Sequence, residues 1–161
     1  MKSFTLIELL IVTTIILVFG GLSLSYYNNF TQEQTLKKEV QKLVDIFELA
    51  KKKASSGDLS GLTCDGGFNG YQVNVTNSGY SLLLKCGGAS VSPAVFSYSF
   101  PSSSNISIIS GTGDYDFREL NLTSTSETRT IQIKNSNISK CLEITIYSSG
   151  IITLSDNFIS C

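Results

Sequence analysis

The chain has 161 residues, a net charge of −1, no histidine and no tryptophan. Without histidine, it lacks the most common general base and the most common zinc ligand. The balanced charge provides no overall basic field that would attract nucleic acid. The length suits one domain preceded by an anchor, and no pairing of a nucleophile with a base stands out, so the sequence favours a protein that is not an enzyme.

The first predicted element is an apolar helix over residues 4–27. From Phe4 to Leu24, polar side chains occur only at Thr5, Glu8, Thr13, Thr14 and Ser23. As a helix this run is about 31 Å long at roughly 1.5 Å per residue, which is enough to cross a bilayer. A carboxylate in such a segment costs roughly 2.5–3.5 kcal/mol on insertion. Glu8 therefore requires a partner.

Two plainer interpretations of this segment are a cleaved secretory signal and a simple transmembrane anchor. The secretory signal is disfavoured because no A-x-A site follows the apolar run and Glu8 lies within it. If the segment were a simple anchor, the carboxylate of Glu8 would have no role.

The stretch Phe4-Thr5-Leu6-Ile7-Glu8-Leu9-Leu10-Ile11-Val12 resembles the opening of type IV pilins and of the pseudopilins of type II secretion systems. The resemblance is very specific from Ser3 to about Leu17. It implies a leader peptide of residues 1–3, cleavage by a prepilin peptidase between Ser3 and Phe4, and N-methylation of Phe4. It also implies that Glu8 pairs with the amino terminus of a neighbouring subunit during assembly. Ser3 departs from the family, which usually has Gly before the cut, and this change is expected to slow cleavage.

Residues 28–56 are predicted to continue the same helix in amphipathic form. Apolar side chains recur at three- and four-residue spacing and would face a globular head; they are Leu36, Val40, Leu43, Val44, Phe47, Ala50 and Ala54. Lys51-Lys52-Lys53 followed by Ser55-Ser56-Gly57 is typical of a helix C-terminus with cations at its negative end. The alternative for the three lysines is contact with DNA phosphates or anionic lipid.

Residues 57–161 are predicted to form a β-rich head of about seven short antiparallel strands. The first hairpin joins Tyr71–Val75 to Tyr80–Lys85 across the turn Asn77-Ser78-Gly79. Further strands are expected at 96–100, 106–108, 130–133, 142–146 and 151–154. The fold class is therefore α+β, with one long helix, transmembrane in its first half and amphipathic in its second, packed on an antiparallel sheet in a pilin-like manner. The segments ELAKKKA, RTIQI and CLEITIYSSGIITL resemble the H-class minor pseudopilins and related minor pilins.

The four cysteines, Cys64, Cys86, Cys141 and Cys161, are an even number, which in an exported domain predicts two disulfides with three allowed connectivities. If the first and last hairpins form, their ends meet, and the nearest partners are Cys64 with Cys86 and Cys141 with Cys161. Pilins often close a C-terminal loop with a disulfide, and the pairing of Cys141 with Cys161 resembles that arrangement. A zinc site is disfavoured because the spacing is not C-x-x-C.

Two weaker signals have two interpretations each. The stretches 65–70 and 111–116 are expected to be turns rather than calcium loops, because neither supplies enough oxygen ligands. The alternating aromatic residues are expected to form the core face of strands rather than a stacking surface for nucleic acid or peptide; they are Tyr71, Tyr80, Phe96, Tyr98 and Phe100. The head cations beyond the helix are scattered in sequence at Lys85, Arg118, Arg129, Lys134 and Lys140.

The expected function is that of a subunit of a type IV pilus or of a type II secretion pseudopilus, with a minor subunit favoured. Its expected partners are other pilin or pseudopilin subunits, a prepilin peptidase, an inner-membrane assembly platform and the membrane itself, and no cofactor is expected. The chain would lie in the cytoplasmic membrane with its head outside the cytoplasm, and then in an extracellular filament or a periplasmic pseudopilus. The alternative is a DNA-binding or adhesive minor pilin that acts in DNA uptake or surface attachment.

Overall fold

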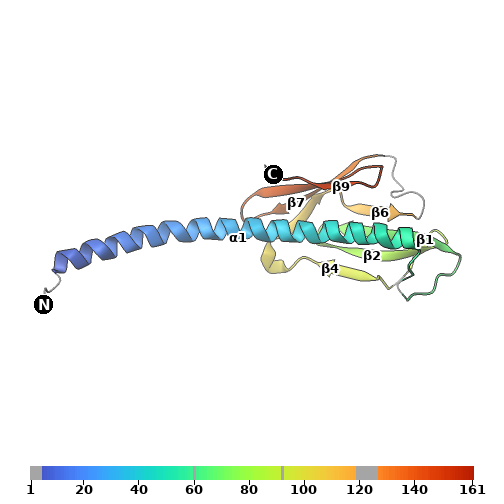
Figure 1. The fold of residues 1–161 in the computed structure, drawn as a ribbon, viewed down its shortest axis with the longest axis horizontal. Helices are drawn as coiled ribbons and strands as arrows, with labels where there is room; N and C mark the ends of the chain where they lie inside the picture. Colours follow the sequence, from blue (N-terminus) through green and yellow to red (C-terminus); the bar gives the residue numbers. More distant parts are fainter. Residues whose placement is uncertain (1–4, 60, 92, 119–126) are drawn as a thin grey trace.

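A single long helix, α1 (Leu6–Ser56), forms the axis of the protein. The computed structural model describes residues 5–59, 61–91, 93–118 and 127–161. The first half of α1 projects away from the head, and the second half is packed within it (Figure 1). Thr5 is the N-cap, and Gly57 ends the helix in the left-handed conformation at φ 63°, which glycine adopts at little cost. The predicted helix end after the three lysines is therefore confirmed.

In its described residues, the head contains ten short strands in two antiparallel sheets. The first sheet has the order β3-β2-β1-β6, and β4 pairs with β2 beside β3; the second has the order β10-β8-β7-β5, and β9 pairs with β8 beside β10. The strands are β1 (Phe68–Thr76), β2 (Gly79–Cys86), β3 (Ala89–Ser90), β4 (Phe96–Ser99), β5 (Ile106–Ser110), β6 (Gly113–Phe117), β7 (Arg129–Asn135), β8 (Lys140–Ile146), β9 (Ile152–Leu154) and β10 (Ile159–Ser160). A short 3₁₀ helix, η1 (Ser102–Ser104), precedes β5.

The core lies where the apolar stripe of α1 meets the inner faces of both sheets. The predicted stripe is confirmed, because Leu36, Val40, Leu43, Phe47, Ala50 and Ala54 are at most 1 % exposed and Val44 packs against the same core. The strands contribute alternate residues, as their two-residue period requires. Val73, Leu82, Leu84, Ile131, Ile133 and Ile144 are fully buried.

The first predicted hairpin is confirmed, with Thr76 paired to Gly79 across Asn77-Ser78. Most of the alternating aromatic residues belong to the core, as expected: Tyr71, Tyr80 and Phe100 are buried, and Tyr98 packs against the core from a partly buried position. Phe96 differs, because it is 39 % exposed at the edge of the first sheet. Its ring stacks on Tyr80, with the ring centroids 6.4 Å apart.

The stretch expected to be a turn at 111–116 is a strand over most of its length, so that prediction is wrong. Residues 113–117 form β6, which pairs with β1. Two side-chain contacts along this pairing fix its register: Asn74 Nδ2 donates to Asp114 Oδ1 at 2.6 Å, and Gln72 Nε2 donates to Asp116 Oδ1 at 2.9 Å. The intervening Tyr115 points inward, where its ring meets that of Phe47 at 5.2 Å. Asp114 and Asp116 therefore lie on the outer face of β6. The short strands β3 and β10 were also not predicted.

Gly70 is a position where the close approach of two strands requires glycine. It has φ 108°, and a Cβ added there would lie 1.9 Å from the backbone oxygen of Phe117. We predict that Gly70→Ala lowers the free energy of unfolding by roughly 1–3 kcal/mol from the unfavourable φ alone, with a further loss because β1 and β6 must separate. Urea unfolding of a fragment of residues 28–161 would measure this. The fragment contains the whole described core, since the first buried residue is Leu36.

Gly67→Ala is the matched control for this substitution. Gly67 also has a positive φ, of 87°, but a Cβ there meets nothing within 4 Å. Its loss of stability should therefore reflect the backbone conformation only. Equal losses for the two variants would show that the contact between Gly70 and Phe117 is unimportant.

Candidate functional site

The part of α1 before Gln32, which projects away from the head (Figure 1) and is called its bare half below, is the most unusual surface among the described residues. Apart from Glu8, no charged residue occurs between Leu6 and Gln32. Its large apolar side chains are solvent-exposed, with exposed fractions from 84 % at Leu6 down to 49 % at Val12, among those the structure describes. Exposed apolar area of this extent marks a surface that another molecule or a membrane covers. Within the described part of the chain, one helix, α1, is long enough and apolar enough to cross a membrane.

The hydroxyl groups in this bare segment are satisfied within the helix. Thr13 Oγ1 donates to the backbone oxygen of Leu10 at 3.0 Å, and Thr14 Oγ1 donates to the same oxygen at 2.8 Å. A hydroxyl that bonds to its own helix requires no water. The two threonines are therefore compatible with a lipid environment, where unsatisfied polar groups are costly.

Glu8 folds back onto the start of its own helix. The Glu8 backbone nitrogen donates to Thr5 Oγ1 at 3.3 Å, and the Glu8 carboxylate accepts from the Thr5 backbone nitrogen at 3.5 Å. Together these contacts form a capping box, which also places a negative charge at the positive end of the helix dipole. Ser3 and Phe4 lie outside the described residues. Their cleavage, the methylation of Phe4 and the pairing of Glu8 with a neighbouring subunit remain predictions.

The hairpin formed by β7 and β8 contacts the helix near its turn and through the turn that follows its open end. Near its turn, Asn135 Nδ2 donates to Gln32 Oε1 at 3.0 Å, and Lys140 forms an ion pair with Glu33. At the other end, Lys51 Nζ donates to the backbone oxygen of Gly150 at 3.0 Å. The head therefore begins, along α1, at about Gln32. These contacts cannot be predicted from local sequence, because they join residues about 100 positions apart.

A buried carboxylate, Glu39, lies at the edge of the helix stripe with only 6 % exposure. It accepts hydrogen bonds from Lys42 Nζ at 2.7 Å and from the Tyr98 hydroxyl at 2.8 Å. The hydrogen bond with Glu39, supported by Tyr98, raises the pKa of Lys42 above its usual value. The spacing of Glu39 from Leu36 and Leu43 places it on the apolar face, and that signal could have identified it from the sequence. The group is a satisfied structural contact between α1 and β4.

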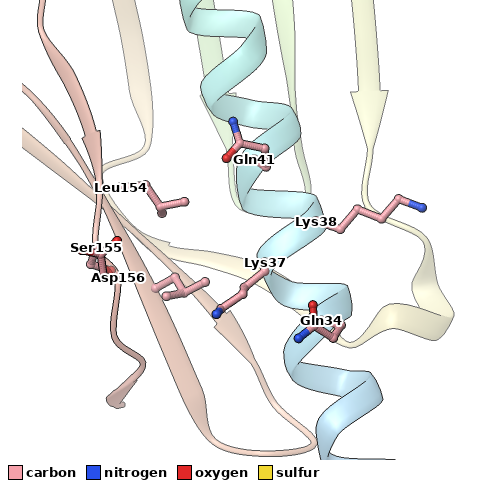
Figure 2. A pocket seen from close by; sticks show the side chains of 8 residues that line it. Gln34, Lys37, Lys38, Gln41, Leu154, Ser155 and Asp156 are labelled. Atoms are coloured by element: carbon pink, nitrogen blue, oxygen red, sulfur yellow. The ribbon is translucent and has the colours of Figure 1, made fainter.

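A shallow cleft of about 360 Å³ lies between α1 and strands β8 and β9 (Figure 2). The helix contributes Gln34, Lys37, Lys38 and Gln41, and the strands and the loop after them contribute Leu142, Leu154, Ser155 and Asp156. Lys38 points away from the strands in Figure 2, whereas Lys37 extends toward Asp156. Lys37 also lies over the ring of Phe158, with Nζ 5.1 Å from its centroid. The lining combines amides, cations and one carboxylate without a nucleophile–base pair.

Several of the five head cations make contacts within the chain. Lys85 forms an ion pair with Asp116 at 2.6 Å, and both side chains are less than 20 % exposed. Arg129 donates to the backbone oxygen of Asp114 at 2.8 Å, and its guanidinium carbon lies 4.0 Å from the centroid of the Tyr115 ring. Lys140 pairs with Glu33. Three of the five cations are thus engaged within the chain.

Both pairs of cysteines are bonded. The structure joins Cys64 to Cys86 and Cys141 to Cys161, with Cα–Cα distances of 5.4 and 5.9 Å. The first bond ties the segment before β1 to the end of β2, and the second ties the C-terminal residue to β8. By the chain-entropy model, each loop of about 20 residues stabilises the fold by roughly 3 kcal/mol. Over the ranges that the structure describes, no cluster of three potential metal ligands occurs.

No protein-family model matches the sequence, and no curated protein matches it. Among solved structures, the chain is similar to the type IV minor pilin FimU of Pseudomonas aeruginosa, with a TM-score of 0.56 and 14 % sequence identity. The match covers 74 % of this chain and 92 % of that one. At this identity the likeness concerns the fold. The chain therefore has the pilin fold, in which one long N-terminal helix packs against an antiparallel β-sheet head.

Proposed function

We propose that this protein is a subunit of a type IV pilus or of a type II secretion pseudopilus. The observation that carries the proposal is the division of α1 into a packed half and a bare apolar half with a single carboxylate, Glu8. A globular head on an exposed apolar helix suits storage in a membrane followed by bundling of the helices in a filament. Repeated head-to-tail contacts of that kind produce open helical assemblies.

The proposal includes processing at the N-terminus. A prepilin peptidase cleaves between Ser3 and Phe4, the new amino terminus of Phe4 is methylated, and Glu8 pairs with that amino group on a neighbouring subunit. The sequence Phe4–Val12 supports this assignment. Among the described residues, the Glu8 carboxylate accepts weak hydrogen bonds from Thr5, at 3.4–3.5 Å, and it can exchange them for a charged partner during assembly.

Within this class a minor subunit is favoured. The supporting observations are the fold shared with a minor pilin and the resemblance of three head segments to H-class minor pseudopilins. Capture of DNA is the less supported role, since three of the five head cations make contacts within the chain.

We predict that the protein enters filaments in cells that assemble them. An epitope tag after Cys161 would follow it through shearing of the cell surface or enrichment of a pseudopilus, with a quantitative blot of filament and membrane fractions. We expect the tagged chain in both fractions, with less in the filament than the principal subunit. Its confinement to the membrane fraction, in cells whose filaments are normal, would contradict the proposal.

A further inference from the structure

We propose that, before assembly, the end of the head nearest the bare helix rests on the phospholipid headgroups at the outer face of the membrane. This membrane-proximal end consists of helix residues 28–38, residues 101–107 around η1, and residues 134–140 around the turn between β7 and β8. The inference rests on the membrane anchoring included in the proposed function. It assigns a surface and a partner that anchoring alone does not specify.

The length of the bare helix sets the depth of the protein in the bilayer. Leu6 to Ser25 spans twenty residues, about 30 Å, which equals the thickness of the hydrocarbon core. Tyr26 and Tyr27 follow directly and are 79 % and 65 % exposed. Tyrosine is enriched where hydrocarbon meets headgroups, because its ring is apolar and its hydroxyl is polar. The two tyrosines therefore mark the outer boundary of the hydrocarbon.

The head begins within reach of that boundary. Asn135 contacts Gln32, which lies six residues beyond Tyr26 and therefore about 9 Å farther along the axis. The β7–β8 hairpin runs along the helix, since Gly150, in the turn that follows its open end, contacts Lys51, while its own turn lies near Gln32. Residues 136–139 consequently project from Asn135 back toward the membrane (Figure 1). The headgroup layer is roughly 5–8 Å thick, so the turn reaches it.

The turn is built as an exposed polar tip that a neighbouring loop supports. The Ser136 backbone nitrogen donates to the backbone oxygen of Asn105 at 3.0 Å, which joins the turn to the loop after η1. The Asn137 backbone nitrogen donates to Asn135 Oδ1 at 2.9 Å. Side chains at Ser136, Asn137 and Ser139 remain exposed, with Ile138 half-buried between them. Such a tip can hydrogen-bond to phosphate and glycerol oxygens without entering the hydrocarbon.

The charge of the membrane-proximal end fits a phosphate layer. Next to the turn, residues 134–140 contain two lysines, Lys134 and Lys140, and no acid, in a chain whose net charge is −1. Glu33 is neutralised by Lys140. A basic surface of this kind is attracted to anionic lipid by about 1 kcal/mol for each cation near the membrane. The positive charge therefore favours outer-leaflet headgroups as the partner of the membrane-proximal end.

The absence of tryptophan makes the contact measurable. The full chain would be reconstituted at a low protein-to-lipid ratio in vesicles of phosphatidylcholine and phosphatidylglycerol that contain a lipid with a nitroxide on its headgroup. Single reporters would be Tyr27→Trp at the boundary, Asn137→Trp at the turn, and Tyr147→Trp at the open end of the hairpin. Ile138→Trp is a second reporter of the turn, in case Asn137→Trp folds poorly.

We expect strong quenching of the Tyr27→Trp and Asn137→Trp chains and little quenching of Tyr147→Trp. Quenching of Tyr27→Trp with none at either turn reporter would overturn the inference while the anchoring stands. Absence of quenching at all positions would instead overturn the anchoring. Equal quenching at the turn and at Tyr147→Trp would show that the head has no fixed orientation and would also overturn the inference.

A pair of charge reversals tests the part played by lysine. Lys134→Glu in the Asn137→Trp chain should weaken the quenching of that reporter and leave the Tyr27→Trp reporter unchanged. Lys52→Glu makes the same change of charge on an exposed residue near the opposite end of the head and should have no effect. Equal effects of the two reversals would contradict a local contact between the turn and the headgroups.

Discussion

Replacement of Glu8 by alanine is expected to remove the protein from filaments and leave it in the membrane. In the proposed assembly, Glu8 neutralises the amino terminus of a neighbouring subunit inside an apolar helix bundle. Removing one partner of a buried ion pair leaves the other charge uncompensated, which costs about 3–5 kcal/mol. That loss corresponds to at least about 100-fold in the affinity of the subunit for its neighbours. The measurement is the ratio of tagged chain in the filament and membrane fractions.

Glu48→Ala is a suitable control for this substitution. Glu48 is on the same helix, its side chain is 51 % exposed, and its contact with Lys51 is a loose one at 3.9 Å. This variant should enter filaments as the unmodified chain does. If Glu8→Ala also enters at the unmodified level, the carboxylate has no part in assembly, and the proposed pairing of Glu8 with a neighbouring subunit is wrong.

Replacement of Phe47 by alanine is expected to cost about 3–5 kcal/mol of stability. Phe47 is fully buried on α1. Its ring meets those of Tyr115 and Phe117 on β6, at centroid distances of 5.2 and 6.0 Å. Truncation would leave a cavity between the helix and the edge strand of the first sheet. Urea unfolding of the 28–161 fragment would measure the change.

Leu49→Ala provides the comparison, because Leu49 lies two residues away on the same helix but is 38 % exposed. Alanine is also the best helix former, so this substitution should cost less than about 1 kcal/mol. A similar loss for the two variants would contradict the assignment of the buried stripe. An unchanged stability for Phe47→Ala would show that the helix does not pack on β6 as described.

The helix could be predicted from the sequence almost completely, for a physical reason. Its apolar stripe repeats at the spacing of an α-helix, and Gly57 ends it, so the pattern and the cap are both local signals. The first hairpin was equally accessible through its turn residues. These elements depend on interactions between residues close in sequence.

Strand β6 could not be predicted because its stability comes from a distant partner. Three of the five residues in its sequence, GDYDF, are glycine or aspartate, which favour turns. Gln72 and Asn74 on β1 bind those aspartates, and Phe47 on α1 covers Tyr115 and Phe117. None of these partners is within 35 residues of β6. Tertiary contacts therefore override the local preference.

For the candidate site, the sequence identifies Glu8 as the unusual residue, and the structure shows what surrounds it. Glu8 is conspicuous as the one charge in an apolar run. The structure adds that this run is bare, that Glu8 caps its own helix, and that the head begins near Gln32. The contacts of Asn135 and Lys140 with the helix have no local pattern, so sequence periodicity cannot reveal them.

The mass of the N-terminal peptide in cells tests the central claim most directly. The protein would be purified from cells with and without the prepilin peptidase, and its first peptide would be identified by mass spectrometry. We predict that, with the peptidase, the peptide begins at Phe4 and carries one N-methyl group, and that without it the peptide retains residues 1–3. Retention of Met1 in both strains would contradict the proposed cleavage between Ser3 and Phe4 and, with it, the assignment of this protein as a processed filament subunit.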